Sequence, residues 1–268
     1  MMNKFFELFL DYNNQDSLNL NIQIGFIVFD IITFIILFFI TAHYGRHIRN
    51  NFKLIIVSDK IGWIIEEFPT IIISVYYTYY YIILTEKINY IKLVMIGFYY
   101  CHYLHRSIIY PINLFTNSRK MPIDIVLMGS TFNFFNSIMI NRSIFIFSDY
   151  TVENVYNFTF LFGCSIFLIG MYINIYHDYY ILSEKKRLNG AYFIPDVFLF
   201  NYICSPNYLG EIIEWIGFAI ATKTLSGMIF FISTFSNLFP RAISHLKWYR
   251  EKFKEFPKNR KAIIPFLI

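Results

Sequence analysis

The chain has 268 residues, of which 56% are hydrophobic, 21% are aromatic and only 15% are charged, and its mean hydropathy is +0.47. This composition excludes an ordinary soluble domain and is typical of a membrane protein. The formal net charge of +5 comes from basic residues that are interleaved with aromatic ones beside apolar runs, which argues against nucleic acid as a partner.

Several apolar runs are long enough, at about 20 residues, to cross a bilayer as helices. They predict an all-α membrane protein with about seven transmembrane helices in a single polytopic domain, 1–268. Acidic residues among the first twenty argue against a cleaved signal peptide and for an uncleaved first anchor. The apolar runs cover residues 23–42, 61–84, 91–114, 123–147, 157–182, 206–222 and 225–246.

Lysine and arginine concentrate in the connections that alternate with these runs on one side of the membrane. They lie in segments 43–60, 115–122 and 183–205 and in the tail that follows residue 246. The positive-inside rule places these segments in the cytosol and the N-terminus across the membrane. We therefore expect a multi-pass membrane protein with a cytosolic C-terminus.

Two adjacent carboxylates, Glu66 and Glu67, stand early in the second apolar run. Adjacent helical positions point about 100° apart, so the two cannot share one role on one face. A charge at the centre of a bilayer costs roughly 2.5 kcal/mol or more, so such groups face a cavity, a partner or a ligand. The alternative is a position at the membrane interface, exposed or paired with a basic residue.

Histidine pairs in the chain have spacings that are compatible with metal binding, with His43 and His47 four residues apart and His102 and His105 three apart. Six histidines without an adjacent pair do not supply the repeated histidine boxes of membrane di-iron enzymes. Three cysteines without CxxC spacing give no zinc site and no disulfide framework. We therefore predict no metal centre.

Polar side chains recur at helical spacing within the apolar runs of the C-terminal half. Such residues can be caps or hydrogen-bonding groups between helices, and membrane anchoring explains the lysines. A phosphate-bearing ligand explains better why an arginine, a histidine and a tyrosine recur on one face. No GxGxxG or GxxxxGK[ST] loop is present, so a dinucleotide would bind without a Rossmann module. The recurring groups are Asn174 with Asp178, Asn207 with Glu211 and Glu214, and Arg241 with His245 and Tyr249.

From about residue 60 onward the chain resembles the steroid 5α-reductase family. The resemblance is carried by many ordered identities, which make it a far more specific signal than a short motif. The matching residues are 63–69, 102–106, 170–175 with Asp178, Tyr192, Ile194-Pro195, 207–215, Arg241-Ala242, His245, Trp248-Tyr249 and 256–266.

The resemblance implies NADPH-dependent reduction of the C4–C5 double bond of 3-oxo-Δ4-steroids, by hydride transfer at the cytosolic side of the membrane. Glu67 and Tyr103 match the residues that polarise the steroid ketone, where charge develops during the reaction. Glu66 departs from the family, which usually has glutamine there. An apolar cavity between the first four helices is expected to hold the sterol skeleton.

The resemblance also implies a wall that binds the dinucleotide. Arginines suit its pyrophosphate, carboxamides suit the nicotinamide amide, and carboxylates suit the ribose hydroxyls. The residues implied are Arg106, Arg119, Asn174, Asp178, Tyr192, Asn207, Glu211, Arg241, His245, Tyr249 and Arg260.

Other classes of membrane protein fit parts of this pattern. Polyprenol reductases and trans-2-enoyl-CoA reductases belong to related families. Membrane lipid and isoprenylcysteine methyltransferases place a related Asn-x-x-Gly-Glu arrangement before a final pair of helices, so binding of NADPH or of S-adenosylmethionine distinguishes these classes. A seven-helix receptor or transporter does not account for polar residues at one cytosolic end. The sequence leaves the exact substrate and the oligomeric state open.

Overall fold

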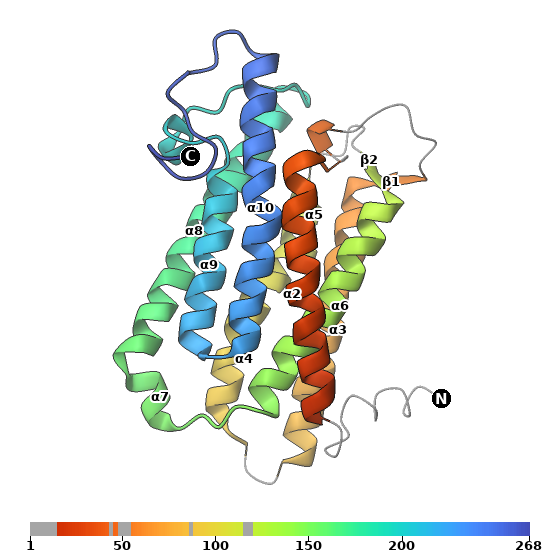
Figure 1. The fold of residues 1–268 in the computed structure, drawn as a ribbon, viewed down its shortest axis with the longest axis vertical. Helices are drawn as coiled ribbons and strands as arrows, with labels where there is room; N and C mark the ends of the chain where they lie inside the picture. Colours follow the sequence, from red (N-terminus) through yellow and green to blue (C-terminus); the bar gives the residue numbers. More distant parts are fainter. Residues whose placement is uncertain (1–14, 43–44, 48–54, 86–87, 115–119) are drawn as a thin grey trace.

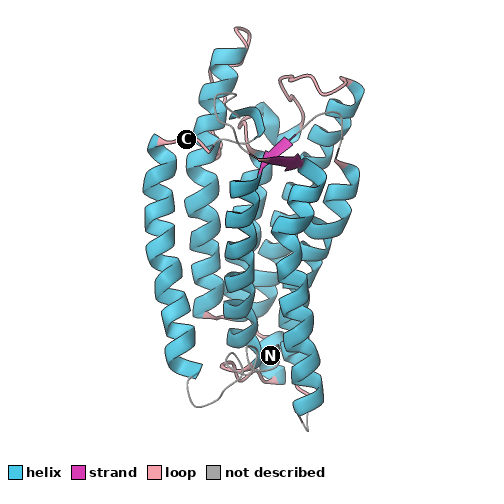
Figure 2. Cartoon of the chain, turned by 90° about the vertical axis from the view of Figure 1, so that its right-hand side faces the viewer, coloured by secondary structure: helices cyan, strands magenta, loops and turns pink. Residues whose placement is uncertain are grey.

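The computed structural model describes residues 15–42, 45–47, 55–85, 88–114 and 120–268. In these ranges the chain is a bundle of long helices that run along a common axis (Figures 1 and 2). The long helices are α2 (Gln15–Phe39), α3 (Asp59–Leu84), α4 (Tyr90–Leu104), α6 (Ile123–Phe145), α8 (Phe158–Arg187), α9 (Pro206–Thr222) and α10 (Leu225–Lys252).

Each apolar run of the sequence coincides with one of these helices, so the predicted helical class is confirmed. The run 91–114 is divided, because α4 continues into a π-helical turn, η3 (His105–Ile109), and then into α5 (Tyr110–Asn113). Within the described residues, three helices have both the length and the hydropathy needed to cross a bilayer: Ser17–Phe39, Ile123–Phe145 and Phe158–Arg187.

Side-chain caps mark where several of the helices begin. Ser58 accepts a hydrogen bond from the backbone nitrogen of Ile61 at the start of α3, at 3.3 Å. Asn157 does the same for Phe160 at the start of α8, at 2.8 Å. These short polar side chains satisfy amide groups that the first helical turn leaves unpaired, and so fix the helix boundaries between apolar runs.

Short elements gather at the end of the bundle that carries the C-terminus (Figure 1). Strands β1 (Ile56–Ser58) and β2 (Lys120–Pro122) pair antiparallel there and join the chain before α3 to the chain before α6. The segment after α10 folds back, and the backbone nitrogen of Cys204 donates to the carbonyl of Lys261 at 2.9 Å. We call residues 188–205 and 253–268 the cap. The remaining short helices are η2 (Gly45–His47), η4 (Phe198–Asn201) and α7 (Val152–Tyr156), of which α7 lies at the opposite end of the bundle (Figure 1).

Helices α8 and α9 touch backbone to backbone because glycines interlock along their contact. Gly163 and Gly170 on α8 face Gly217 and Gly210 on α9, with spacings of seven residues on each helix. A Cβ added at Gly170 would overlap the backbone of Glu214. Small residues at such a contact allow the close helix packing that is common within membranes.

Gly170→Ala should therefore destabilise the protein. The added methyl meets backbone that cannot rotate away, so we expect a loss of about 1–3 kcal/mol, which is typical of overpacking. Thermal unfolding in detergent measures the effect. The matched control is Gly97→Ala on α4, where an added Cβ meets nothing within 4 Å. Equal melting temperatures for the two variants would contradict the packing argument.

Candidate active site

A cavity of about 520 Å³ opens among the helices at the C-terminal end of the bundle. This volume is within the roughly 300–1,000 Å³ range of small-molecule sites. The first four long helices contribute, as expected, but α8, α9 and α10 also line the cavity. Its apolar lining includes Phe29, Ile32, Ile36, Met128, Phe132 and Phe230.

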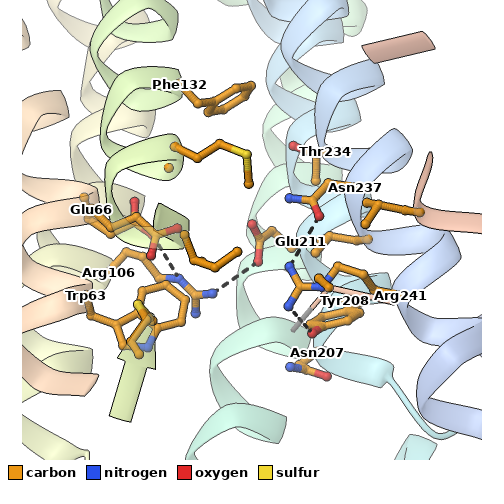
Figure 3. A pocket seen from close by; sticks show the side chains of 18 of the residues that line it. Trp63, Glu66, Arg106, Phe132, Asn207, Tyr208, Glu211, Thr234, Asn237 and Arg241 are labelled. Carbon is orange, nitrogen blue, oxygen red and sulfur yellow. Dashed lines mark hydrogen bonds and ion pairs between the residues drawn. The ribbon is translucent and has the colours of Figure 1, made fainter. Parts of the chain in front are cut away.

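Arg106, on the π-helical turn, is the centre of the charged part of this cavity (Figure 3). Its guanidinium lies 3.0 Å from Asp178 Oδ2, 3.7 Å from Glu67 Oε1 and 3.8 Å from Glu211 Oε2. The same group stacks over the ring of Trp63 at 4.5 Å. One buried cation thus holds carboxylates from α3, α8 and α9 around a shared space.

Carboxamides complete this cluster. Asn207 Nδ2 donates to Asp178 Oδ1 at 2.9 Å, and Asn174 Nδ2 donates both to the Asn207 carbonyl at 3.0 Å and to Glu211 Oε2 at 3.3 Å. Five residues implied by the resemblance, these four and Arg106, are therefore in contact across α8, α9 and the π-helical turn. Their role in binding a cofactor remains a prediction.

Tyr103 and Glu67 are joined through Asn133 of α6. Tyr103 Oη donates to Asn133 Oδ1 at 3.3 Å, and Asn133 Nδ2 donates to Glu67 Oε2 at 3.0 Å. All three side chains are buried and line the cavity. Nothing in the sequence distinguishes Asn133 from the other asparagines of its run, because its partners come from two other helices.

Glu66 and Glu67 have different surroundings, as their helical positions require. Glu67 is 8% exposed and lies 3.7 Å from Arg106, so of the two alternatives its side chain is paired with a basic residue and is not exposed. Glu66 lines the cavity on another side, where Gly129 of α6 leaves the space that its carboxylate occupies. Both carboxylates thus face the cavity, from different directions.

The end of the cavity nearest the cap is cationic and aromatic. Arg241 donates to the Tyr208 hydroxyl at 3.0 Å and to Asn237 Oδ1 at 3.3 Å, as Figure 3 shows. His245 lies 3.3 Å from Ser205 Oγ through its Nδ1 atom. This arrangement leaves a basic wall for an anionic group.

Arg46 of η2 adds a positive charge to this basic wall, and His47 of η2 adds an aromatic ring. The sequence indicated only membrane anchoring for Arg46 and a spacing for His47. The His47 ring stacks on that of His245, with centroids 5.6 Å apart. Burial and the nearby Arg46 lower the pKa of His47 to about 4, so its ring is neutral at pH 7. No helical period links η2 to the other elements, which is why sequence reasoning missed both residues.

Two implied residues, Tyr249 and Arg260, are not among those that line the cavity. The Tyr249 ring stacks on Phe256 at 5.2 Å and carries the Arg46 guanidinium 4.8 Å above it. Arg260 donates to the Pro195 carbonyl at 2.6 Å. Both residues hold the cap together behind the basic wall, and their contact with a cofactor remains a prediction.

Of the last two implied residues, Tyr192 and Arg119, the structure describes Tyr192. Tyr192 lines the cavity and packs against the Trp248 ring at 4.8 Å. Arg119 lies outside the described residues. The predicted wall of Asn207, Glu211 and Glu214 is also divided, because Glu214 lies behind the cavity, where it contacts His102.

A cavity between helices with an apolar part and a polar cluster is the kind of site that a helical membrane enzyme uses for a lipophilic substrate. The family model for 3-oxo-5-alpha-steroid 4-dehydrogenase matches residues 119–268. The chain belongs to this family. The predicted class, an oxidoreductase that acts on CH–CH groups, is thereby confirmed.

Individual relatives extend the match over nearly the whole chain. Steroid 5-alpha-reductase DET2 of Solanum lycopersicum is 38% identical over 254 residues, which cover 91% of this chain and 96% of that protein. DET2 of Arabidopsis thaliana is 39% identical over 242 residues, covering 88% and 91%. The 3-oxo-5-alpha-steroid 4-dehydrogenase 1 of Homo sapiens is 34% identical over 228 residues, covering 84% and 85%.

Proposed function

We propose that the protein reduces the C4–C5 double bond of a 3-oxo-Δ4-steroid with NADPH, by hydride transfer at the cytosolic side of the membrane. The observation that carries this proposal is the chain of hydrogen bonds from Tyr103 through Asn133 to Glu67 at a cavity with an apolar wall. The names of the relatives support the substrate class.

The ketone end of the substrate would lie at Glu67 and Tyr103. NADPH supplies the hydride when it is bound. As the double bond accepts hydride, negative charge develops on the ketone oxygen. The Tyr103 hydroxyl, which donates to Asn133 in the structure, would turn to this oxygen, and its hydrogen bond becomes stronger as the charge develops. Glu67 is 8% exposed and Tyr103 is 3% exposed, so water competes little for this position.

The remaining walls suit the two other parts of the reaction. The apolar side chains of α2, α6 and α10, such as Phe29, Phe132 and Phe230, would cover the steroid rings. In Figure 3, Phe132 and Thr234 lie in the upper part of the view and Asn207 lies at the bottom. Asn207 and Glu211 would bind the nicotinamide riboside, and the basic wall would bind phosphates.

The test of this function is a screen of the purified protein in detergent. NADPH consumption is followed with enone steroids, polyprenols and enoyl-CoA thioesters, and binding of S-adenosylmethionine is measured in parallel. We expect reduction of the enone steroids. Turnover of a polyprenol or an enoyl-CoA alone would assign the chain to a related activity instead.

Seven membrane crossings, an endoplasmic reticulum location and a cytosolic C-terminus are parts of the same proposal. The seven crossings are supported by the seven apolar runs and the long helices that coincide with them, and the orientation by the asymmetry of lysine and arginine between the two ends of the bundle. A tag at the C-terminus of protein in sealed microsomes should be removed by external protease. A protected tag would reverse the orientation and the side from which cofactor enters.

Arg241→Ala should weaken NADPH binding by roughly tenfold to a hundredfold, because a charge-assisted contact to phosphate contributes about 1.5–3 kcal/mol. Titration of NADPH fluorescence measures the effect. Arg260→Ala is the comparison, since its guanidinium holds the cap at Pro195. We expect that variant to lose thermal stability as well as affinity. An unchanged NADPH affinity in Arg241→Ala would show that the basic wall does not bind the cofactor.

A further inference from the structure

A buried pair of titratable side chains, His102 on α4 and Glu214 on α9, lies beside the proposed reaction centre. His102 Nδ1 and Glu214 Oε1 are 2.8 Å apart. Glu214 is 0% exposed and His102 is 5% exposed. The Trp215 ring packs on the His102 ring at 4.6 Å and keeps its plane fixed.

Of this pair, it is His102 that lines the cavity. Its ring neighbours that of Tyr103, with centroids 5.1 Å apart. Because Nδ1 is engaged by Glu214, Nε2 is the ring nitrogen that remains for a molecule in the cavity. The imidazole therefore connects a fully buried carboxylate to the space where the substrate is proposed to bind.

The surroundings of Glu214 require the pair to hold a proton. Among the described residues, Glu214 Oε2 has no hydrogen-bond partner. A buried carboxylate with so little solvation is stable as an anion only if a cation lies beside it, and otherwise it keeps its own proton. In the first case the extra proton is on His102, and in the second it is on Glu214. In both cases the pair holds one proton more than a neutral imidazole beside an ionised carboxylate.

The proposed reaction needs such a proton. When hydride adds to the β-carbon of the enone, the electrons of the double bond move to the ketone oxygen and give an enolate. The product forms only when the α-carbon gains a proton. In the proposed reaction Glu67 lies at the ketone oxygen, and Asp178 and Glu211 are held by the Arg106 guanidinium, so we look to another group beside the cavity for this proton.

Resting on the proposed function, we infer that His102 is the general acid that protonates the α-carbon and that Glu214 positions and charges it. The Nε2–H bond breaks as the C–H bond forms, and the electron pair of the enolate makes that new bond while the ketone is restored. The imidazole then regains a proton from solvent. One hydride from NADPH and one proton from water are consumed in each turnover.

The experiment uses the full-length protein in detergent, NADPH, and progesterone as the 3-oxo-Δ4-steroid. We expect His102→Gln to lower kcat by roughly a hundredfold or more, as for loss of a general acid, with NADPH affinity unchanged. The solvent deuterium isotope effect on kcat should rise, because proton transfer becomes the slow step. Glu214→Gln should lower kcat by less and displace the pH–rate profile. Wild-type kcat should fall as pH rises and the pair loses the proton that His102 and Glu214 share.

The matched control is His105→Gln, whose ring packs against Tyr179 and does not line the cavity. It should retain the wild-type kcat and isotope effect. If His102→Gln loses thermal stability but keeps both values, the pair only joins α4 to α9 and the inference fails. If His102→Gln does not fold, the wild-type pH profile decides, and a flat profile overturns the inference. A wild-type protein that reduces no enone overturns the proposed function as well.

Discussion

Glu67→Ala and Tyr103→Phe should each lower kcat and kcat/KM for an enone steroid by about a hundredfold or more. Both side chains are proposed to act on the charge that develops on the ketone oxygen, and interactions made in the transition state affect both constants alike. Tyr103→Phe removes the hydroxyl that donates to Asn133 at 3.3 Å and leaves the ring packing intact. Single-turnover reduction with NADPH already bound isolates this step from binding.

Two further variants sharpen this prediction. Tyr100→Phe removes a hydroxyl that pairs with Thr78 at 3.0 Å and does not line the cavity, so it should behave like the wild type. Glu66→Gln restores the residue that is usual in the family and should retain substantial activity. Near-normal chemistry in Glu67→Ala would remove the ketone-polarising role and leave the proposed mechanism without support.

The helices could be predicted from the sequence because each apolar run is bounded by polar or capping residues. The run 157–182 became Phe158–Arg187 and the run 225–246 became Leu225–Lys252, so the starts agree within one residue. Both helices extend several residues beyond the apolar run at their C-terminal ends. Lysine and arginine have a high helix propensity, so the helix continues through them. Because they are not apolar, the apolar run ends before the helix does.

The site could be predicted in part, because helical spacing places residues on faces but does not choose their partners. Asn207 and Glu211 line the cavity as the spacing indicated. Glu214 lies one turn further along α9, and the close glycine contact between α8 and α9 turns it toward His102 instead. Asn133 carries no distinguishing signal, since its importance depends on Glu67 and Tyr103, which lie far from it in the sequence.

Removal of the central cation should affect stability more than any other change to the cavity. Arg106 is the shared partner of Glu67, Asp178 and Glu211, and its side chain is 12% exposed. Arg106→Ala would leave two buried carboxylates, Glu67 and Asp178, and the partly buried Glu211 without it. The loss of one partner from a buried charge cluster costs about 3–5 kcal/mol, so we expect the melting temperature in detergent to fall by roughly 10 °C.

The cause of the lower stability of Arg106→Ala can be tested by neutralising the three carboxylates, which removes their mutual repulsion without restoring the arginine. Arg106→Lys keeps a positive charge but not the planar group that reaches several carboxylates at once, so it should recover part of the stability. Arg106→Ala combined with Glu67→Gln, Asp178→Asn and Glu211→Gln should recover more, because no uncompensated charge remains. Lower pH should also narrow the difference between Arg106→Ala and the wild type, since protonation neutralises the carboxylates. A deficit that is unchanged by pH and by the amide substitutions would mean that Arg106 stabilises the bundle through its packing against Trp63, and that the carboxylates do not depend on its charge.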